Sequence, residues 1–311
     1  TERVLHIPRI LYSYRQAPGS VAGDLAAKPE IHERGRLSLA GARYEGILPE
    51  KVDIAPNAWS GIYRVRLRAE RALVDVAVLD PEQKDQPACC DPPGVEIAAV
   101  TCRRKDEAAG SLLRRALECA ASPFVLVVSR TVWAGQSWIP SLVERVGGVR
   151  IGAIAPKILF RGKVDHCGIA FAVGARILFP LRGLEVDDPA YGAYGAVARN
   201  VSAVAPCAVL FNVSALRQAG GFDERMDEFG GVIAACFALR TNGYRILADG
   251  GTCAELECGP YVVSPSMAAG GEDFRRLVAT WPSLFCGGDP YYNRNLREEP
   301  ADFGVRDERD F

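Results

Sequence analysis

Apolar positions in the middle of the chain fall into short continuous runs that are separated by segments with helical spacing. Residues 72–80 (ALVDVAVLD), 95–102 (VEIAAVTC) and 124–129 (FVLVVS) are typical of strands buried on both faces. Between the second and third runs, residues 107–122 place apolar side chains at the spacing of a helix. Strands that alternate with helices predict an α/β domain, with a mostly parallel sheet covered by helices on both faces.

The N-terminal part of the chain has a different pattern. Residues 26–44 show roughly helical spacing, and residues 61–70 alternate in polarity like a strand. One helix and one strand indicate an arm rather than a domain. We therefore predict an arm over residues 1–70 and one larger domain over residues 71–311.

Composition narrows the class of protein. With 311 residues, of which 49% are hydrophobic and 24% charged, the chain can bury a full core. A formal net charge of −1 gives no overall field that would attract nucleic acid or an anionic membrane. No stretch reaches the roughly 18 apolar residues of a spanning helix, and the first ten residues lack the pattern of a signal peptide. We expect a cytoplasmic protein without a nucleic-acid partner or a transmembrane segment.

The cysteines raise the question of a metal site. The chain has ten cysteines but only three histidines, and no two cysteines have the C-x-x-C spacing of zinc ligands. Cys167, Cys207 and Cys236 lie in apolar runs, so we expect most cysteines to be buried like small hydrophobic residues. Cys89 and Cys90 lie in a proline-rich loop and should be exposed. No metal and no cofactor are expected.

Five separated segments carry a resemblance to a known family. They are HIPRILYSYR (6–15), VRIGAIAPKILF (149–160), VDHCGIAFA (164–172), the run around GGFDE (199–246), and a Trp281…DPYYNRNL…DF string (281–303). In this order they resemble bacterial family 2 glycosyltransferases, such as rhamnosyl and O-antigen transferases. The first segment is similar to a linker between tandem transferase domains. The resemblance implies a GT-A fold and transfer of a sugar from a nucleotide donor.

The chain departs from this family on the donor side. After the strand at 124–128, the family has a pair of acids whose oxygens hold a divalent cation. Ser129 and Arg130 stand there instead. Only residues 81–94 separate the first two strands, and their prolines oppose a helix, so the resemblance implies a truncated nucleotide-binding half. Arg130 and Ser129 remain candidates for phosphate binding, although Arg130 is also explained as a solvated residue at a strand end.

The acceptor side departs as well. Where the family has the acid that deprotonates the acceptor, this chain has Gly231-Val232-Ile233-Ala234. Loss of such a base costs about 10² to 10⁴ in rate. The family's histidine pair is also missing from residues 254–259, and His166 is expected to be a packed residue. The nearest acids are Asp223, Glu224, Asp227 and Glu228.

Two roles are open for these four acids. One of them could be a displaced base, or the turn at Asp223 and Glu224 could cap the following helix. The second role fits a catalytically inactive, glycosyltransferase-like protein that acts as a scaffold or binding subunit. Its partner, or a second copy, would bind the apolar and aromatic residues of the arm and of the C-terminal DPYYNRNL tail (residues 289–303), and nucleotide-sugar binding would be lost. The alternative is an active, metal-independent hexosyltransferase that acts on a glycan or lipid-linked acceptor.

Overall fold

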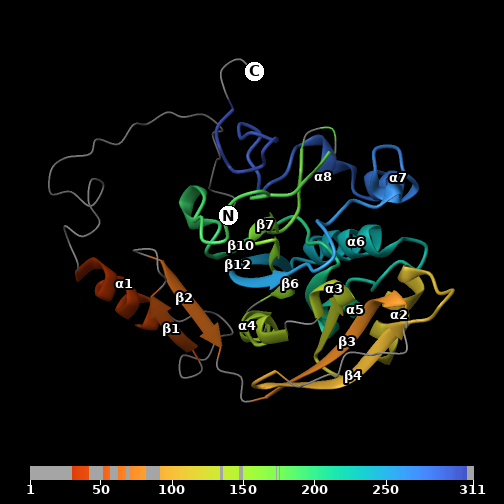
Figure 1. The fold of residues 1–311 in the computed structure, drawn as a ribbon, viewed down its shortest axis with the longest axis horizontal. Helices are drawn as coiled ribbons and strands as arrows, with labels where there is room; N and C mark the ends of the chain where they lie inside the picture. Colours follow the sequence, from red (N-terminus) through yellow and green to blue (C-terminus); the bar gives the residue numbers. More distant parts are fainter. Residues whose placement is uncertain are drawn as a thin grey trace. The chain divides into compact units, whose positions relative to one another are not determined.

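The computed structural model divides into two compact units, Thr1–Arg68 and Ala69–Phe311. Both are drawn in Figure 1. The residues that the structure describes are 30–41, 52–56, 62–67, 71–81, 92–133, 136–146, 150–172, 174 and 176–306.

In its described residues, the first unit contains one helix and one hairpin. Helix α1 (Glu30–Gly41) packs on β1 (Val52–Pro56), which pairs antiparallel with β2 (Tyr63–Leu67). The hydroxyl of Tyr63 donates to the backbone oxygen of His32 over 2.5 Å. A helix and a strand thus form where the sequence predicts them.

The other predictions for the arm are not tested by this structure. Its role as an arm stays a prediction. Its apolar residues lie outside the described residues, and they are Ile7, Ile10, Leu11, Tyr12 and Tyr14.

The second unit is built on one eight-stranded sheet. Its order is β10-β12-β6-β11-β5-β3-β4, and β7 pairs with β6 outside this path. Five strands (β3, β4, β5, β6 and β12) run in one direction, and β7, β10 and β11 run in the other. The predicted α/β class with a mostly parallel sheet is confirmed. The strands are β3 (Ala72–Pro81), β4 (Val95–Arg103), β5 (Phe124–Val128), β6 (Ile151–Phe160), β7 (Lys163–His166), β10 (Ala198–Asn200), β11 (Ala208–Asn212) and β12 (Arg245–Glu255).

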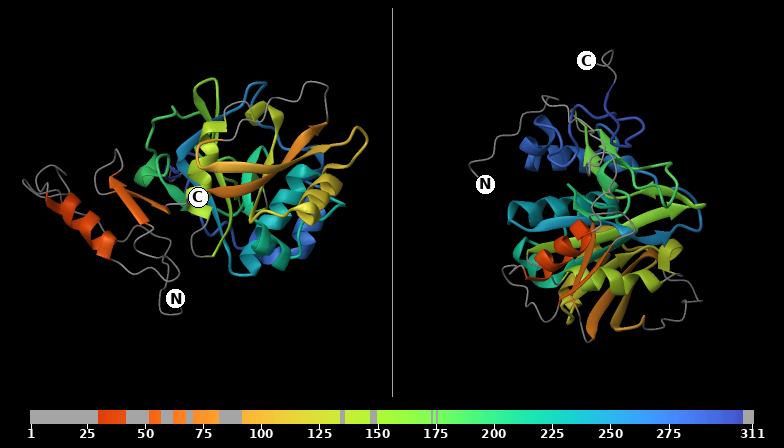
Figure 2. Two further views of the ribbon diagram at one scale, coloured as in Figure 1. Left: turned by 90° about the horizontal axis from the view of Figure 1, so that it is seen from below. Right: turned by 90° about the vertical axis from the view of Figure 1, so that its left-hand side faces the viewer.

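Helices cover both faces of this sheet, as predicted. Helix α4 (Ile139–Val146) lies on one side, and α2 (Ala109–Cys119), α5 (Val213–Gln218) and α6 (Glu228–Thr241) lie on the other (Figures 1 and 2). Residues 125–128 of the central strand β5 are buried on both faces. That is why this run contains only apolar residues.

The segment between β3 and β4 is the place of the predicted truncation. The two strands are direct, parallel neighbours. Residues 82–91, which connect them, lie outside the described residues, so the loss of a helix and strand there stays a prediction. Among the helices that the structure describes, none is long and apolar enough to cross a bilayer.

Short elements complete the second unit. They are α3 (Arg130–Trp133), β8 (Ala170–Phe171), β9 (Ile177–Leu178), α7 (Glu272–Thr280), α8 (Pro282–Cys286) and the 3₁₀ turns η3 (Gln136–Trp138), η4 (Tyr191–Ala193) and η5 (Pro265–Met267).

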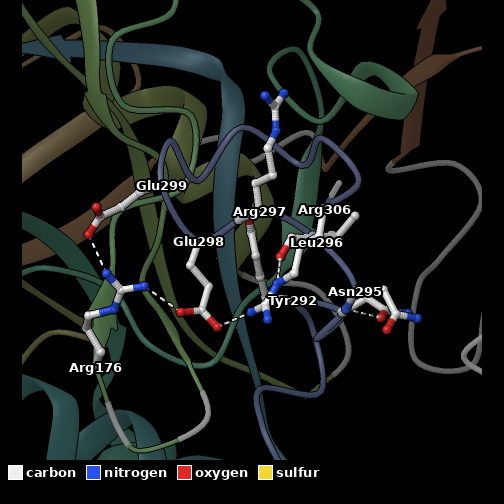
Figure 3. Close-up of polar contacts among 9 residues, drawn as sticks. Arg176, Tyr292, Asn295, Leu296, Arg297, Glu298, Glu299 and Arg306 are labelled. Atoms are coloured by element: carbon white, nitrogen blue, oxygen red, sulfur yellow. Dashed lines mark hydrogen bonds and ion pairs between the residues drawn. The ribbon is translucent and has the colours of Figure 1, made fainter. Parts of the chain in front are cut away.

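The C-terminal motif is tied to β8 and to the loop before β9. The carboxylate of Asp289 accepts the amide of Phe171 over 3.0 Å. Glu298 binds both Arg176 and Arg306, and Figure 3 shows this carboxylate between the two guanidinium groups. The DPYYNRNL motif therefore belongs to the fold of this unit.

The cysteines are less buried than predicted. Cys167, Cys207 and Cys236 are buried, as the apolar runs indicate. Cys119, Cys253, Cys258 and Cys286 are exposed, so the expectation that most cysteines are buried is wrong. The exposed ones lie at helix ends, in a loop or on the outer face of β12, where an apolar run does not imply burial. Cys89 and Cys90 lie outside the described residues.

Candidate functional site

The carboxyl end of β5 is held by the strand beside it. Because β11 runs antiparallel to β5, the start of β11 lies next to the end of β5. The amide of Ser129 donates to the carbonyl of Cys207 over 3.0 Å, and the hydroxyls of Ser129 and Thr131 lie 2.9 Å apart. The predicted phosphate-side residue Arg130 begins α3, and a binding role for its side chain stays a prediction.

The oxygens at this strand end do not fit a divalent cation. Ser129 and Thr131 offer neutral hydroxyls that already bind each other, whereas Mn²⁺ and Mg²⁺ prefer carboxylate oxygens. Within the described part of the chain, no group of three His, Cys, Asp or Glu side chains is placed to hold a metal ion.

Next to this strand end lies a buried chain of three polar side chains. Nδ1 of His166 lies 2.7 Å from a carboxylate oxygen of Asp165, and its Nε2 lies 3.6 Å from the sulfur of Cys207. Since the carboxylate accepts at Nδ1, we assign the ring proton to that nitrogen, and the thiol then donates to Nε2. We call Asp165, His166 and Cys207 the histidine cluster.

Burial determines the protonation states of His166 and Cys207 in the histidine cluster. Burial lowers the pKa of His166, and the hydrogen bond to Asp165 opposes this only in part. Burial also raises the pKa of the Cys207 thiol. The imidazole and the thiol are therefore both neutral at pH 7, and the thiol is not a nucleophile.

Aromatic rings surround the histidine cluster. The ring of Tyr261 lies between His166 and Phe229, with centroid distances of 5.6 and 5.7 Å. Phe179 lies 5.7 Å from His166, and the guanidinium of Arg182 lies 4.0 Å above Phe179. This column connects the start of α6 with β7 and the turn after β9.

The Tyr261 segment is tied to the histidine cluster by its backbone. The Tyr261 amide donates to Asp165 over 3.2 Å, and its carbonyl accepts Arg182 over 2.9 Å. Arg182 also donates to the carboxylate of Asp165 over 3.1 Å. Burial raises the pKa of the Tyr261 phenol well above its usual value, and the nearby Cys207, Glu228 and Asp227 add to this.

The four acids singled out from the sequence do not meet in one place. Asp223 holds Arg225 through three bonds of 2.7 to 3.0 Å, and this pairing lowers the pKa of Asp223. Glu224 is exposed and pairs with Arg114 over 3.1 Å. Glu228, half-buried, is the first residue of α6.

The cap of α6 is Asp227. One oxygen of Asp227 accepts the amide of Gly230 over 2.7 Å, as at a helix N-cap. The expected capping by the turn at Asp223 and Glu224 is therefore wrong. That turn ends before the helix, and its carboxylates bind arginines instead.

A further acid, from α7, packs against the start of α6, and no sequence motif marks it. Asp273, in the first turn of α7, is 3% exposed and accepts the amide of Asp227 over 2.9 Å. The hydroxyl of Ser266 contacts both carboxylates. A Cβ at Gly230 would lie 2.7 Å from the Asp273 carboxylate, so the glycine permits this close approach. We call Asp227, Ser266 and Asp273 the α6 cap cluster.

The residues at the positions where the resemblance leads us to expect acids lie in the core. Val232 and Ile233 are fully buried, and Ala234 is 6% exposed. A Cβ at Gly231 would lie 3.7 Å from Leu113 of α2. This turn of α6 packs against neighbouring helices rather than presenting polar groups.

No protein family model matches the chain. Over 174 residues, however, it is 28% identical to the O-antigen biosynthesis protein RfbC of Myxococcus xanthus. The match covers 55% of this chain and 13% of RfbC, so the chain spans a small part of that protein. This similarity confirms the resemblance to O-antigen biosynthesis proteins that the sequence motifs indicate.

Solved structures with a similar arrangement include two sugar-transfer proteins. GalNAc-T7, solved with UDP, GalNAc and Mn2+, is 11% identical with a TM-score of 0.47 and covers 86% of this chain and 57% of its own. The mannosyltransferase PcManGT of Pyrobaculum calidifontis, in complex with GDP-Man and Mn2+, is 13% identical with a TM-score of 0.38 over 76% of this chain and 66% of its own.

The sequence names Ser129 and Asp227 as candidates, and the structure places Ser129 beside Cys207. It predicts His166 as a packed residue, and His166 is buried. It missed Tyr261 and Asp273. Tyr261 follows a Gly-Pro pair, and Asp273 is the second residue of an amphipathic helix. Neither pattern distinguishes a site residue from an ordinary one.

Proposed function

We propose that this chain is a GT-A-like glycosyltransferase module without catalytic activity, which serves as a scaffold or binding subunit in polysaccharide biosynthesis. The similarity to RfbC supports the biosynthetic context. Because the match covers 13% of RfbC, the role of a longer protein is not transferred to this chain.

The observation that carries the proposal is that the carboxylates of Asp223, Glu224 and Asp227, before α6, are already bound by other groups of the protein. A general base must reach the acceptor hydroxyl with a free carboxylate. Asp223 and Glu224 bind arginines, and Asp227 caps α6 and contacts Ser266. The helical turn that carries the base in the family is filled with Val232 and Ile233 in the core.

The donor side supports the same proposal. Ser129 presents a hydroxyl that is bound to Thr131, and it cannot replace a carboxylate as a ligand for a hard cation. The imidazole of His166 has both ring nitrogens engaged, so it is not available to a phosphate.

Calorimetric titration tests the proposal. UDP-glucose, UDP-GlcNAc, GDP-mannose and dTDP-glucose would each be added to the protein with and without Mn²⁺. We expect no saturable heat at millimolar ligand and no effect of Mn²⁺. A dissociation constant in the micromolar range that depends on the metal would contradict the proposal, as would anomalous density for Mn²⁺ beside Ser129.

A second candidate function is metal-independent transfer of a hexosyl group. Glu228 favours it, because this half-buried acid is the first residue of α6. Its negative charge also raises the pKa of the Tyr261 phenol. Transfer that persists in EDTA would support this function. Glu228→Gln would then lower the rate by about 10² to 10⁴, as expected for a general base. The control Asp223→Asn would leave the rate unchanged.

A further inference from the structure

The histidine cluster joins segments that are far apart in the sequence. Its members lie on β7 and at the start of β11, and Asp165 also accepts the backbone amide of Tyr261 from the chain after β12. The carbonyl of Cys207 in turn accepts the amide of Ser129 at the end of β5. A change in the cluster therefore acts on the ends of β5 and β7 and on the segment that follows β12.

The hydrogen bonds of His166 require a neutral ring. Nδ1 donates to Asp165, so Nε2 must carry a lone pair to accept the thiol hydrogen of Cys207. A second proton on the ring would occupy Nε2 and point a donor at the thiol. The ring is 2% exposed, so water cannot solvate the resulting charge.

Arg182 adds to the cost of a charged His166. Its guanidinium donates to the side chain of Asp165 and to the carbonyl of Tyr261, over 3.1 and 2.9 Å. The carboxylate of Asp165 thus already neutralises one cation, and a second cation would share it. Water could solvate the charge of a protonated His166 if it entered between the Tyr261 segment and Asp165. Its entry would break the bond from the Tyr261 amide to Asp165.

We propose that His166 is a pH-sensitive latch, and that its protonation in mild acid releases the segment around Tyr261 (residues 257–264) from β7. Release would expose the histidine cluster and the start of α6 to solvent. Around Tyr261, the segment is held by its two backbone bonds to Arg182 and Asp165, and its other backbone bonds lie at its ends, at Glu257 and Ser264. The part around Tyr261 is therefore the one that gives way when the bonds at the latch break.

The charged and titratable groups around the latch come from five elements. They are Asp165 on β7, Arg182 in the turn after β9, Cys207 before β11, Tyr261 after β12, and Asp227 and Glu228 at the start of α6. Asp227 and Glu228 act on the phenol of Tyr261, whose pKa their negative charges raise.

Nuclear magnetic resonance can follow the latch directly, because the chain has only three histidines. In protein labelled with ¹⁵N at histidine, we expect His166 to show the Nδ1-protonated neutral form and to titrate at a lower pH than an ordinary histidine. In the same pH range, the amide of Tyr261 should lose its protection against hydrogen exchange. After correction for the intrinsic rate, exchange should accelerate about tenfold for each pH unit across the titration window.

Two variants keep this test decisive. His166→Gln retains a donor for Asp165 and an acceptor for the thiol but does not titrate, so exchange at Tyr261 should become independent of pH. If this variant does not fold, Cys207→Ala removes the thiol donor that favours the neutral ring, and the acceleration should shrink. His32→Gln, in the other unit, is the control and should behave as the unaltered protein. The proposal is overturned if corrected exchange at Tyr261 is the same at pH 7 and pH 5, or if His166→Gln retains the acceleration.

Discussion

The α6 cap cluster and the C-terminal residues 289–303 each hold a carboxylate in place, but the groups that bind the two carboxylates differ. Asp273 accepts a backbone amide and a hydroxyl in a buried position. Glu298 is partly exposed and lies between Arg176 and Arg306. Where arginine supplies the counter-charge, the acid is a structural ion pair. Where only neutral donors are present, burial and the neighbouring Asp227 raise the pKa of Asp273, so this carboxyl remains able to take up a proton.

The largest expected effect is that of Gly230→Ala. The new methyl group would lie 2.7 Å from the Asp273 carboxylate and 2.8 Å from its Cβ, so α7 must move. We expect a loss of about 1 to 3 kcal/mol in the free energy of unfolding, measured by urea denaturation. The matched control is Gly231→Ala, whose methyl would meet Leu113 at an ordinary 3.7 Å. This control should be neutral or gain up to about 1 kcal/mol from helix propensity. Equal losses in both variants would show that the close approach of Asp273 does not require a glycine at position 230.

Removal of the cap comes next in size. Asp227→Ala leaves the amide of Gly230 without its side-chain acceptor, and we expect a loss of about 1 kcal/mol. Asp227→Asn retains an oxygen at the cap and should lose less. Thermal denaturation of the two variants measures the difference, and an alanine variant as stable as the asparagine variant would argue against the capping role.

A smaller effect should appear in the pH dependence of stability. The pKa of Asp273 is raised in the folded state, so folding favours the protonated form. The stabilisation is complete below the unfolded pKa of about 3.9, and it is lost as the pH rises through the folded value. Asp273→Asn removes this titration. Its melting temperature relative to the unaltered protein should therefore increase from pH 4 upward and then level off. A difference that is constant with pH would mean that folding does not raise the pKa of Asp273.

The smallest effect is expected at the arginine-paired carboxylate. Glu298→Gln breaks two ion pairs whose arginines are partly exposed, so we expect a loss of less than about 1 kcal/mol that decreases further in high salt. Urea denaturation at low and high NaCl measures it. A loss larger than that of Gly230→Ala would reverse the comparison between the two regions.

The elements of the sheet could be predicted because their signals are local. The apolar run at 124–129 and the helical spacing at 107–122 depend only on neighbouring residues, and β5 and α2 form there. The residue that caps α6 could not be predicted from such local signals. Whether Asp223 or Asp227 caps α6 depends on where the chain turns into the helix, and packing against Asp273 decides that.

The candidate site was less predictable, because its contacts join distant segments. Asp165 meets the amide of Tyr261, and Asp227 meets Asp273, only after β7, β12 and α7 are in place. No spacing in the sequence encodes these distances. The motif around His166 is visible in the sequence, but the apolar run around Cys207 predicts only a buried residue. The hydrogen bond of its thiol follows from the antiparallel course of β11.

That course of β11 also bears on how the chain folds as it is synthesised. β5 lies in the middle of the finished sheet, but one of its two edges is covered only by β11. Residues 129–207 separate the two strands, so β3, β4, α2 and β5 emerge from the ribosome long before that edge has its partner. Until then the sequence FVLVV presents unpaired backbone groups next to apolar side chains, which is the arrangement that promotes aggregation of nascent chains. The yield of folded protein in the cell should therefore depend on chaperones that bind this half of the sheet before residue 212 is made.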